Sequence, residues 1–486
     1  MNQLKVLSAV GVELRGAWAL LLALLVAFTG CGKTARLDPD LARLVEEKRA
    51  QAHELAVAQT NPVASKVWKF FDAVERDDWH SATNIFGELE SLRPNYSSYE
   101  LGPSARFWAK ARSWFEIAFG FRRPRTPSAL DTALWGPIVE TRGAGEVFHD
   151  WDSGLLHRFG NDIIKSIPTN SIYFGGSDAG RFAVTALSQS YRKAKPFFTL
   201  TQNALADYSY RDYLGQMYGK RIHIPTEAES HQAFQDYMED AQKRLQAGLL
   251  KPSEVPGTTG IRNENGLVVS SGLVGVMDIN GRLVKVILDK NPGHEVYLEE
   301  SYVIEWMNLQ IIPHGLIFKL NREPVRELDE AVVREDHEYW LRYAGQLVGP
   351  WLTDNTSVKE ICDFARRVYL QKDLSAFTGD PAFARNEAAR KGFSKLRSAI
   401  GGVYAWRAEH TANADARARM LREADFAFRQ ALALCPNSTE AVFRYANFLK
   451  SARRSEDAKL VAETARALEP SSEQWKELIG HLKQGR

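Results

Sequence analysis

The chain has 486 residues, 44% of them hydrophobic, and its 62 basic and 60 acidic side chains leave a net charge of +2. This nearly neutral balance argues against proteins that bind nucleic acids or membrane surfaces through bulk charge, and we expect no nucleic-acid partner. The length predicts two to three domains. The eleven histidines show no spacing typical of metal ligands, so we expect no metal site and no cofactor.

Residues 1–31 have the pattern of a secretion signal. Two basic residues precede an apolar run at 17–29, whose 13 residues are too few for a membrane-spanning helix, which needs about 20. The segment 28–31 (FTGC) resembles a bacterial lipobox, in which the cysteine carries the lipid. Gly32 is not the aspartate that retains lipoproteins at the inner membrane. We therefore expect lipidation of Cys31 and a periplasm-facing protein of the cell envelope, anchored at the outer membrane. A secreted or signal-anchored chain is the alternative.

The same region also fits the pattern of a nucleotide-binding P-loop, with Ala27, Gly32, Lys33 and Thr34 at the required spacing. That pattern requires a helix after the lysine, so that backbone N–H groups face the phosphates. Pro39 falls where this helix would run, and proline interrupts helices. Nucleotide binding at this segment is therefore not expected.

A repeat with a period of 34 residues runs from 424 to 470. Its marker residues are Ala424, Phe428, Ala431 and Pro436, which recur as Ala458, Ala462, Ala465 and Pro470. Their types and spacing resemble the second helix of a tetratricopeptide repeat (TPR), in which alanines lie where two helices cross closely and proline ends the helix. The resemblance implies helix hairpins over 394–486 that bind a protein partner in a groove and perform no chemistry. An insertion at 410–420 departs from the family pattern, and an ordinary helical hairpin is the alternative.

A similar second helix occurs near the start of the chain. Ala82, Phe86, Leu89 and Pro94 have the same offsets as the markers of the C-terminal repeat. Because a single unit is visible, a degenerate repeat and a plain helical hairpin within 61–159 fit the sequence equally well.

The central region, 160–325, alternates β-type runs with helical stretches, which predicts a mainly parallel sheet covered by helices. The expected strands are 171–174, 196–201, 273–277, 295–299 and 315–320. The expected helices are 180–193, 210–218, 227–246 and 279–290. Asp278 would cap the last of these helices, and a hairpin turning at Asn280-Gly281 is the alternative for 273–288.

The whole chain is therefore expected to be α+β, with a central α/β domain flanked by α-helical, TPR-like hairpins. The predicted divisions are a signal peptide at 1–31, a charged helical stalk at 32–60, a helical hairpin region at 61–159, the α/β domain at 160–325, a helical connector at 326–393 and the repeats at 394–486.

Sheets of this kind bind ligands outside the carboxyl ends of their strands. Three of the expected strand ends carry polar residues, the last of them with Glu299, Glu300 and Ser301. The candidate ligand-binding residues are Gly175, Gly176, Ser177, Asp178, Arg181, Asn203 and Asp207. Two glycines before a helix allow an anion to approach backbone N–H groups closely, and Arg181 would contact a phosphate. In the alternative interpretation, Asp178 is a helix N-cap and the other polar groups satisfy loop backbone.

The sequence lacks a complete set of catalytic residues. The motif at 175–179 (GGSDA) misses the last glycine of a nucleophile elbow. Two Asp-x-Asp pairs, at 38–40 and 150–152, resemble the pair that holds a metal and a nucleotide sugar in some glycosyltransferases, but chance supplies about one such pair in a chain of this length. Cys362 and Cys435 are expected to be buried free thiols rather than a disulfide. We therefore expect no catalytic residues, and a protein that is not an enzyme.

Three segments of the central region, 171–182, 198–214 and 296–320, resemble the soluble C-terminal region of bacterial protein O-mannosyltransferase-like membrane proteins. The residues that fall on that family's pattern are Asp178, Asn203, Asp207, Pro313 and Gly315. The sequence shows no counterpart of the multi-span membrane domain in which that family's sugar transfer takes place. The resemblance therefore implies an exported accessory domain linked to envelope glycan assembly rather than a transferase.

Together these features predict a lipid-anchored scaffold of the cell envelope, whose lipid enters the membrane and whose partner protein binds the repeat groove. The alternative is a sensor or an enzyme that acts on a sugar phosphate or a lipid-linked sugar through the α/β domain.

Overall fold

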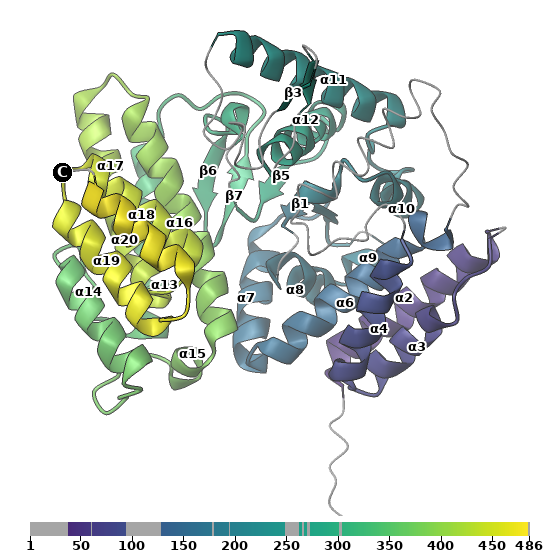
Figure 1. Ribbon diagram of the computed structural model, residues 1–486, viewed down its shortest axis with the longest axis horizontal. Coiled ribbons are helices and arrows are strands. Elements are labelled where there is room, and N and C mark those ends of the chain that lie inside the picture. Colours follow the sequence, from purple (N-terminus) through teal and green to yellow (C-terminus); the bar gives the residue numbers. More distant parts are fainter. Residues whose placement is uncertain are drawn as a thin grey trace, which may run out of the picture.

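A computed structural model of the protein describes residues 37–59, 61–93, 128–176, 179–193, 195–247, 262–264, 267–269, 273–300 and 304–484. The predicted signal peptide with Cys31 lies outside these ranges, as do Ser177, Asp178 and Pro94. Within them, no helix combines the length and the apolar character that a membrane crossing requires. Figure 1 shows a small sheet surrounded by helices.

The N-terminal region is helical. Its elements are α2 (Pro39–Val57), α3 (Lys66–Glu75), α4 (Trp79–Ser91), the 3-10 turn η1 (Ala129–Asp131), α6 (Trp135–Asp150) and α7 (Ser153–Ser166). Asp38 caps α2 and a proline occupies its first turn, which together fix where this helix begins. α3 and α4 pack against each other as a helix hairpin, in which Ala82 and Leu89 are buried. This hairpin packs against α2 and α6.

The central region holds a five-stranded sheet. Its strands are β1 (Ile172–Gly175), β2 (Phe198–Thr201), β5 (Val296–Leu298), β6 (Ile311–His314) and β7 (Ile317–Leu320), in the spatial order β2-β1-β5-β7-β6. β1 is parallel to β2 and β5, whereas β7 is antiparallel to both of its neighbours. The sheet is therefore mixed, and the prediction of a mainly parallel sheet is wrong. Two short strands, β3 (Arg262–Glu264) and β4 (Leu267–Val269), form a separate antiparallel pair.

The antiparallel edge of the sheet arises from a tight hairpin. β6 is absent from the expected strands, and a two-residue link, Gly315-Leu316, joins it to β7. Gly315 has a φ of +62°, and tight hairpins use a glycine with positive φ at this place. The sequence therefore contains the turn signal, but the run at 315–320 predicts only the second strand of the hairpin and not β6.

The helical elements of the central region cover the sheet. They are α8 (Ala179–Ser188), α9 (Ser190–Lys193), η2 (Gln202–Ala204), α10 (Tyr208–Tyr218), α11 (Glu227–Gln246), α12 (Leu273–Lys290) and η4 (Glu305–Met307). The expected strand at 273–277 is wrong, as is the alternative hairpin at 280–281, because α12 runs through both. Asp278 does not cap this helix but lies inside it and pairs with Arg282. A short apolar run fits a strand or a helix equally well, and here it continues the helical spacing that follows it.

The C-terminal third of the protein, from residue 330 to residue 484, consists of helices and their connections. They are α13 (Glu330–Val348), α14 (Val358–Ala365), the π-helical turn η5 (Arg366–Leu370), α15 (Pro381–Arg385), α16 (Glu387–Glu409), α17 (Ala414–Leu434), α18 (Thr439–Ser451), α19 (Ser455–Leu468) and α20 (Glu473–Gln484). α16 packs on α17, α18 packs on α19, and α20 packs on α19. Consecutive helices therefore form a stack of hairpins.

The marker residues of the repeat lie at helix contacts and helix ends. The buried markers are Ala424, Phe428, Ala431, Ala458, Ala462 and Ala465. Pro436 follows the end of α17, and Pro470 follows the end of α19. The insertion at 410–420 adds the first turns of α17, so the first hairpin is the longer one. Its helices have 23 and 21 residues, against 13 and 14 in the second.

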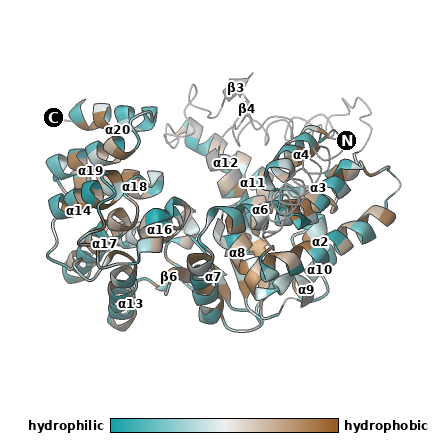
Figure 2. Ribbon diagram, turned by 90° about the horizontal axis from the view of Figure 1, so that it is seen from below, coloured by the Kyte–Doolittle hydropathy of each residue, from teal (hydrophilic) through white to brown (hydrophobic). Residues whose placement is uncertain are grey.

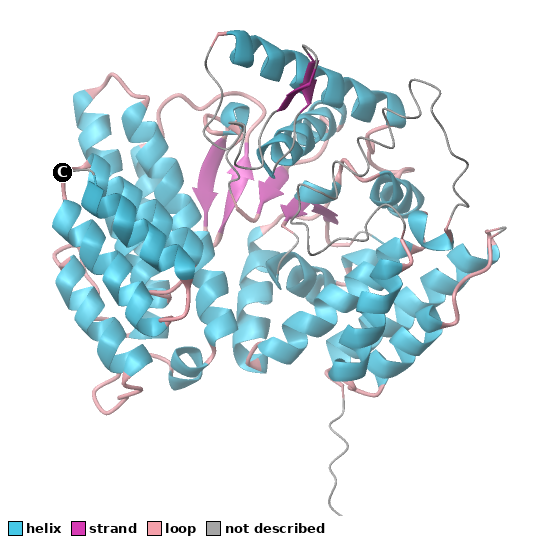
Figure 3. Ribbon diagram, in the orientation of Figure 1, coloured by secondary structure: helices cyan, strands magenta, loops and turns pink. Residues whose placement is uncertain are grey.

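The sheet lies between two groups of helices. Figure 1 shows α13–α20 on one side of it and α2–α4 on the other, and the turned view in Figure 2 places α17–α20 and α2–α4 at opposite ends of the molecule. One apolar core runs from the sheet through α13 to α20, whereas α2–α4 share a second core with η1 and α6. The strands are thus enclosed by helices, as Figure 3 shows.

Candidate functional site

The carboxyl ends of three parallel strands meet at one edge of the sheet. Gly175 of β1 pairs with Thr201 of β2, and Phe174 of β1 pairs with Leu298 of β5. The chain leaves β1 for β2 on one side and returns to β5 on the other, so β1 is the point at which the strand order reverses. The three polar strand ends singled out in the sequence are thereby brought together.

The side chain of Glu299 occupies the space that the glycines leave at this edge. It is 5% exposed, and its Oε2 accepts a hydrogen bond from the backbone N–H of Gly176 at 3.2 Å. A Cβ at Gly180, in the first turn of α8, would lie 1.8 Å from Glu299 Oε1, and one at Gly175 would lie 2.8 Å from Oε2. The glycines therefore admit a buried carboxylate of the protein itself to the start of α8, where the sequence suggests an anionic ligand.

Arg181 points into a cluster of buried charges. Its Nη2 donates to Oε1 of Glu140 on α6, and Lys48 Nζ lies 2.5 Å from Oε2 of the same carboxylate. Tyr213 of α10 donates to Glu140 Oε2 at 2.8 Å. Burial opposes ionisation of Glu140, but Arg181 and Lys48 more than offset it and lower the pKa of Glu140 to about 2. Within the described part of the chain, Nε and Nη1 of Arg181 have no hydrogen-bond partner.

The remaining predicted residues at this edge have structural roles. Asp207 caps α10, because its Oδ1 accepts hydrogen bonds from the N–H and the hydroxyl of Ser209, both at 2.8 Å. Asn203 lies in η2, where its carbonyl accepts a hydrogen bond from α12 at 3.2 Å. Glu300 pairs with Lys395 of α16 at 2.9 Å, which brings the helical array against the sheet edge.

The Asp-x-Asp pair at 150–152 forms part of a helix junction. Asp152 caps α7 by accepting a hydrogen bond from the N–H of Leu155 at 3.1 Å. The side chain between the two aspartates, Trp151, is 6% exposed and belongs to the main core. Cys362 and Cys435 are both buried and free, as expected, and burial raises the pKa of each thiol to about 11.

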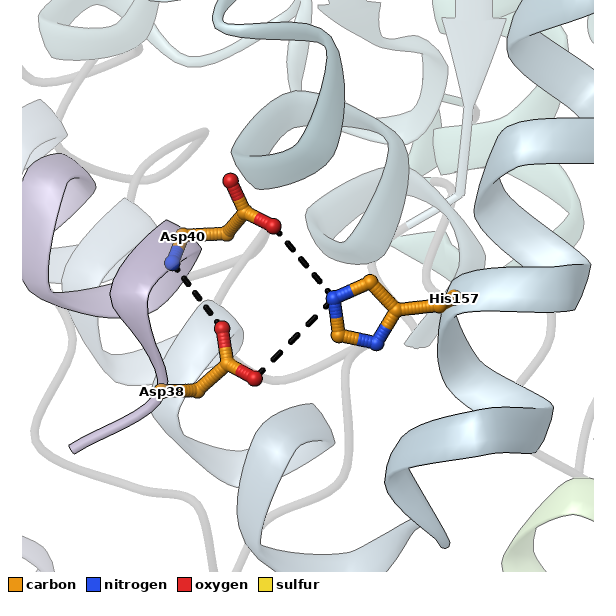
Figure 4. A group of neighbouring side chains, drawn as sticks. All are labelled: Asp38, Asp40 and His157. Atoms are coloured by element: carbon orange, nitrogen blue, oxygen red, sulfur yellow. Dashed lines mark hydrogen bonds and ion pairs between the residues drawn. The ribbon is translucent and has the colours of Figure 1, made fainter. Parts of the chain in front are cut away.

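The other Asp-x-Asp pair meets a histidine. Asp38 and Asp40, at the start of α2, lie opposite His157 of α7, as Figure 4 shows. The Nε2 atom of His157 lies 3.3 Å from Asp40 Oδ2 and 3.9 Å from Asp38 Oδ2. The three side chains are 21% to 32% exposed, so solvent reaches the cluster.

Each member of this cluster is oriented by a further contact. His157 Nδ1 lies 2.7 Å from the carbonyl oxygen of Ser153, one turn earlier in α7. Asp38 Oδ1 accepts the N–H of Asp40 at 2.9 Å, and Asp40 Oδ1 pairs with Arg43. Partial burial opposes the charge on His157, but the Ser153 carbonyl and the two carboxylates together raise the pKa of His157 above its ordinary value. The cluster therefore favours a positive charge between the carboxylates.

A pocket of about 190 Å³ adjoins the cluster through Asp38. Its walls include Leu41, Asp77, Trp79 and His149. The pocket therefore combines apolar walls with carboxylate and imidazole groups.

Sequence reasoning misses this cluster because its members are far apart along the chain. Asp40 and His157 are separated by 117 residues, so the spacing of the histidines cannot reveal the pair. The Asp-Pro-Asp segment at 38–40 is the one signal available in the sequence. It gains a partner only when α7 packs beside the start of α2.

Comparisons of the chain with family models, with curated proteins and with solved structures find no match. The resemblances to TPR proteins and to O-mannosyltransferase-like membrane proteins therefore stay predictions.

Proposed function

We propose that the protein is an exported, lipid-anchored scaffold of the bacterial cell envelope, in which the stacked hairpins of α16–α20 bind a segment of a partner protein. The observation that carries the proposal is the polar face of α18. Glu440, Asn447 and Ser451 are exposed and share one side of this helix, because they are spaced by seven and four residues. The opposite side, with Tyr445 and Leu449, is buried in the array.

The second helices of the hairpins are covered by other elements. α14 packs on α17 and on α19, and α13 packs on α17. In α20, by contrast, Glu473 and Glu477 are exposed while Trp475 is buried. α18 and α20 therefore both offer exposed polar side chains to a partner, and the TPR resemblance implies that the partner binds a concave face of such an array.

The alternative function, a sensor or enzyme for a sugar phosphate or a lipid-linked sugar, depends on the sheet edge. The geometry favours it less, because Glu299 fills the start of α8 and Asp207 serves as a helix cap. The central region still contributes to the proposal. Its resemblance to O-mannosyltransferase-like proteins supports a role of the scaffold beside envelope glycan or glycoprotein assembly.

Site-specific photo-crosslinking in intact cells tests the scaffold proposal. A photoreactive residue at Asn447 on α18 is expected to capture one defined protein, whereas the same residue at the exposed Glu463 on α19 is not. Charge reversal at Glu440 should reduce the capture at Asn447, and reversal at the exposed Arg466 on α19 should leave it unchanged. Equal products from both helices, or no product at Asn447, would contradict the proposal.

A further inference from the structure

The start of α2 and the middle of α7 bring three potential metal ligands together. The donor atoms are Oδ2 of Asp38, Oδ2 of Asp40 and Nε2 of His157 (Figure 4), and one ligand atom from each residue lies within 4.8 Å of the others. We propose that these three residues bind a divalent transition-metal cation, with Zn²⁺ as the best match. One imidazole and two carboxylates form a donor set that Zn²⁺ accepts.

The spacing of the donors agrees with a tetrahedral ion. Zn²⁺ binds histidine nitrogen and carboxylate oxygen at about 2.0–2.2 Å, so neighbouring ligand atoms of a tetrahedral site are about 3.3–3.5 Å apart. The observed separations from His157 Nε2 are 3.3 Å to Asp40 and 3.9 Å to Asp38. The Asp40 oxygen thus matches the expected separation, whereas the Asp38 oxygen would have to move closer to His157.

Contacts outside the donor set hold the ligands in a metal-binding orientation. Metal-binding histidines usually donate their other ring N–H to a carbonyl or carboxylate, which fixes the tautomer. His157 has this arrangement, since its Nδ1 lies 2.7 Å from the Ser153 carbonyl and its Nε2 faces the aspartates. The second oxygens of Asp38 and Asp40 are held by a backbone N–H and by Arg43.

Charge and access also suit a cation. Two carboxylates face one imidazole, and Arg43 pairs with the Asp40 oxygen that is turned away from His157. With three protein ligands and an exposed rim, a bound ion would keep at least one position for water, next to the pocket that Asp38 lines.

The proposed ion would join α2 to α7. Asp38 and Asp40 lie at the beginning of the first described helix, and His157 belongs to the helix that precedes β1. Because an ion bound by the folded protein stabilises that state, metal would fasten the N-terminal helix to the body of the protein.

Titration calorimetry of the full-length, tag-free protein in detergent, after treatment with a chelator, tests the proposal with ZnCl₂. We expect one Zn²⁺ per chain, and visible absorption bands of tetrahedral Co²⁺ when Co²⁺ is used instead. His157→Gln and Asp40→Asn should each weaken Zn²⁺ binding by about 100-fold or more, because even residues that merely support metal ligands contribute 10–100-fold. The matched control is His149→Gln, which changes a histidine of the neighbouring pocket. This variant should bind Zn²⁺ with the affinity of the wild-type protein.

Two results would overturn the proposal. One is the absence of saturable Zn²⁺ binding by the wild-type protein, and the other is equal affinity in the wild type and the His157→Gln variant. Either result would leave the cluster as a contact of His157 with the two aspartates and no bound ion. Circular dichroism and thermal unfolding without metal establish whether each variant is folded. If one of the two variants, His157→Gln or Asp40→Asn, is unfolded, the Zn²⁺ affinity of the other variant tests the proposal.

Discussion

At the scale of single residues, the buried charges of this protein depend on partners from different helices. Three charged side chains from different helices are almost fully buried: Lys48 of α2, Glu140 of α6 and Arg181 of α8. Both cations pair with the Glu140 carboxylate. Removing an ion from water costs several kcal/mol unless good partners replace the water. Glu140 is the partner of both cations, so its loss leaves two buried positive charges without their counter-ion.

The variant Glu140→Gln is therefore expected to lower the free energy of unfolding by about 3–5 kcal/mol, the range for breaking a buried ion pair. The control is Glu146→Gln on the same helix. Glu146 is 52% exposed and pairs with Arg142 one turn away, so its change should cost less than about 1 kcal/mol. Urea unfolding of both variants measures the difference. Similar losses in the two variants would show that the buried cluster does not depend on Glu140.

At the scale of elements, close helix crossings shape the C-terminal array. Gly401 of α16 faces Phe428 of α17, and a Cβ at this glycine would lie 3.0 Å from the ring. At the next residue, Gly402, a Cβ would meet no atom of the described residues within 4 Å, apart from its chain neighbours and the backbone of its own helix. Of two adjacent glycines in one helix, only Gly401 therefore lies at a close helix crossing.

This pair gives a prediction with a built-in control. Gly401→Leu is expected to destabilise the protein by about 1–3 kcal/mol, because the added atoms overpack the contact with Phe428. Gly402→Ala should instead raise the free energy of unfolding by about 0.5–1 kcal/mol, because alanine favours the helix and meets no neighbour. Denaturant unfolding midpoints measure both effects. If Gly401→Leu were neutral, the α16–α17 crossing would be looser than the structure indicates.

At the scale of the whole molecule, a few polar contacts join the helical array to the sheet. Arg407 of α16 donates to the carbonyls of Val325 and Ile311 at 2.8 Å and 3.1 Å, the second of them in β6. Burial lowers the pKa of Arg407 to about 10, which keeps it charged at neutral pH. Trp340 of α13 also donates to the carbonyl of Gly315, in the turn that follows β6.

Removing the side chain of Arg407 should weaken the contact between the helical array and the sheet. In Arg407→Ala the carbonyls of β6 and of the segment after β7 lose a charged donor, and each such bond contributes about 1.5–3 kcal/mol. We expect faster amide hydrogen exchange over 309–325 and a lower free energy of unfolding. Arg466→Ala, an exposed position on α19, should leave both unchanged. Unaltered hydrogen exchange at 309–325 in Arg407→Ala would show that apolar packing alone holds the helical array against the sheet.

Much of the secondary structure could be predicted from the sequence. The expected helix at 227–246 is α11, and β1, β2 and β5 fall within expected runs apart from one residue at the end of β1. The prediction of a strand at 273–277 is wrong because this run is short and apolar, and such a run fits a strand or a helix equally well. The prediction of a mainly parallel sheet is wrong at the β7–β6 edge. The order and direction of strands depend on which strand edges remain free to pair, and the sequence does not show this.

The candidate sites, too, were predicted from the sequence only in part. Polar residues after three strands were found from the sequence, and β1 does bring these strand ends together. That Glu299 would fill the space beside Gly180 could not be predicted, because these residues come from different strands and helices. The meeting of Asp40 with His157 is a second example, since it depends on how α2 packs beside α7.

The sequence by itself determined the helical hairpins of the C-terminal array and the buried free thiols, because these follow from residues that are neighbours along the chain or from burial of apolar side chains. Only the tertiary structure decided the mixed strand order, the buried cluster around Glu140 and the Asp38–Asp40–His157 group. Each of these joins segments that are distant in sequence, and the packing of whole helices and strands brings them within the few ångströms over which charges and hydrogen bonds act.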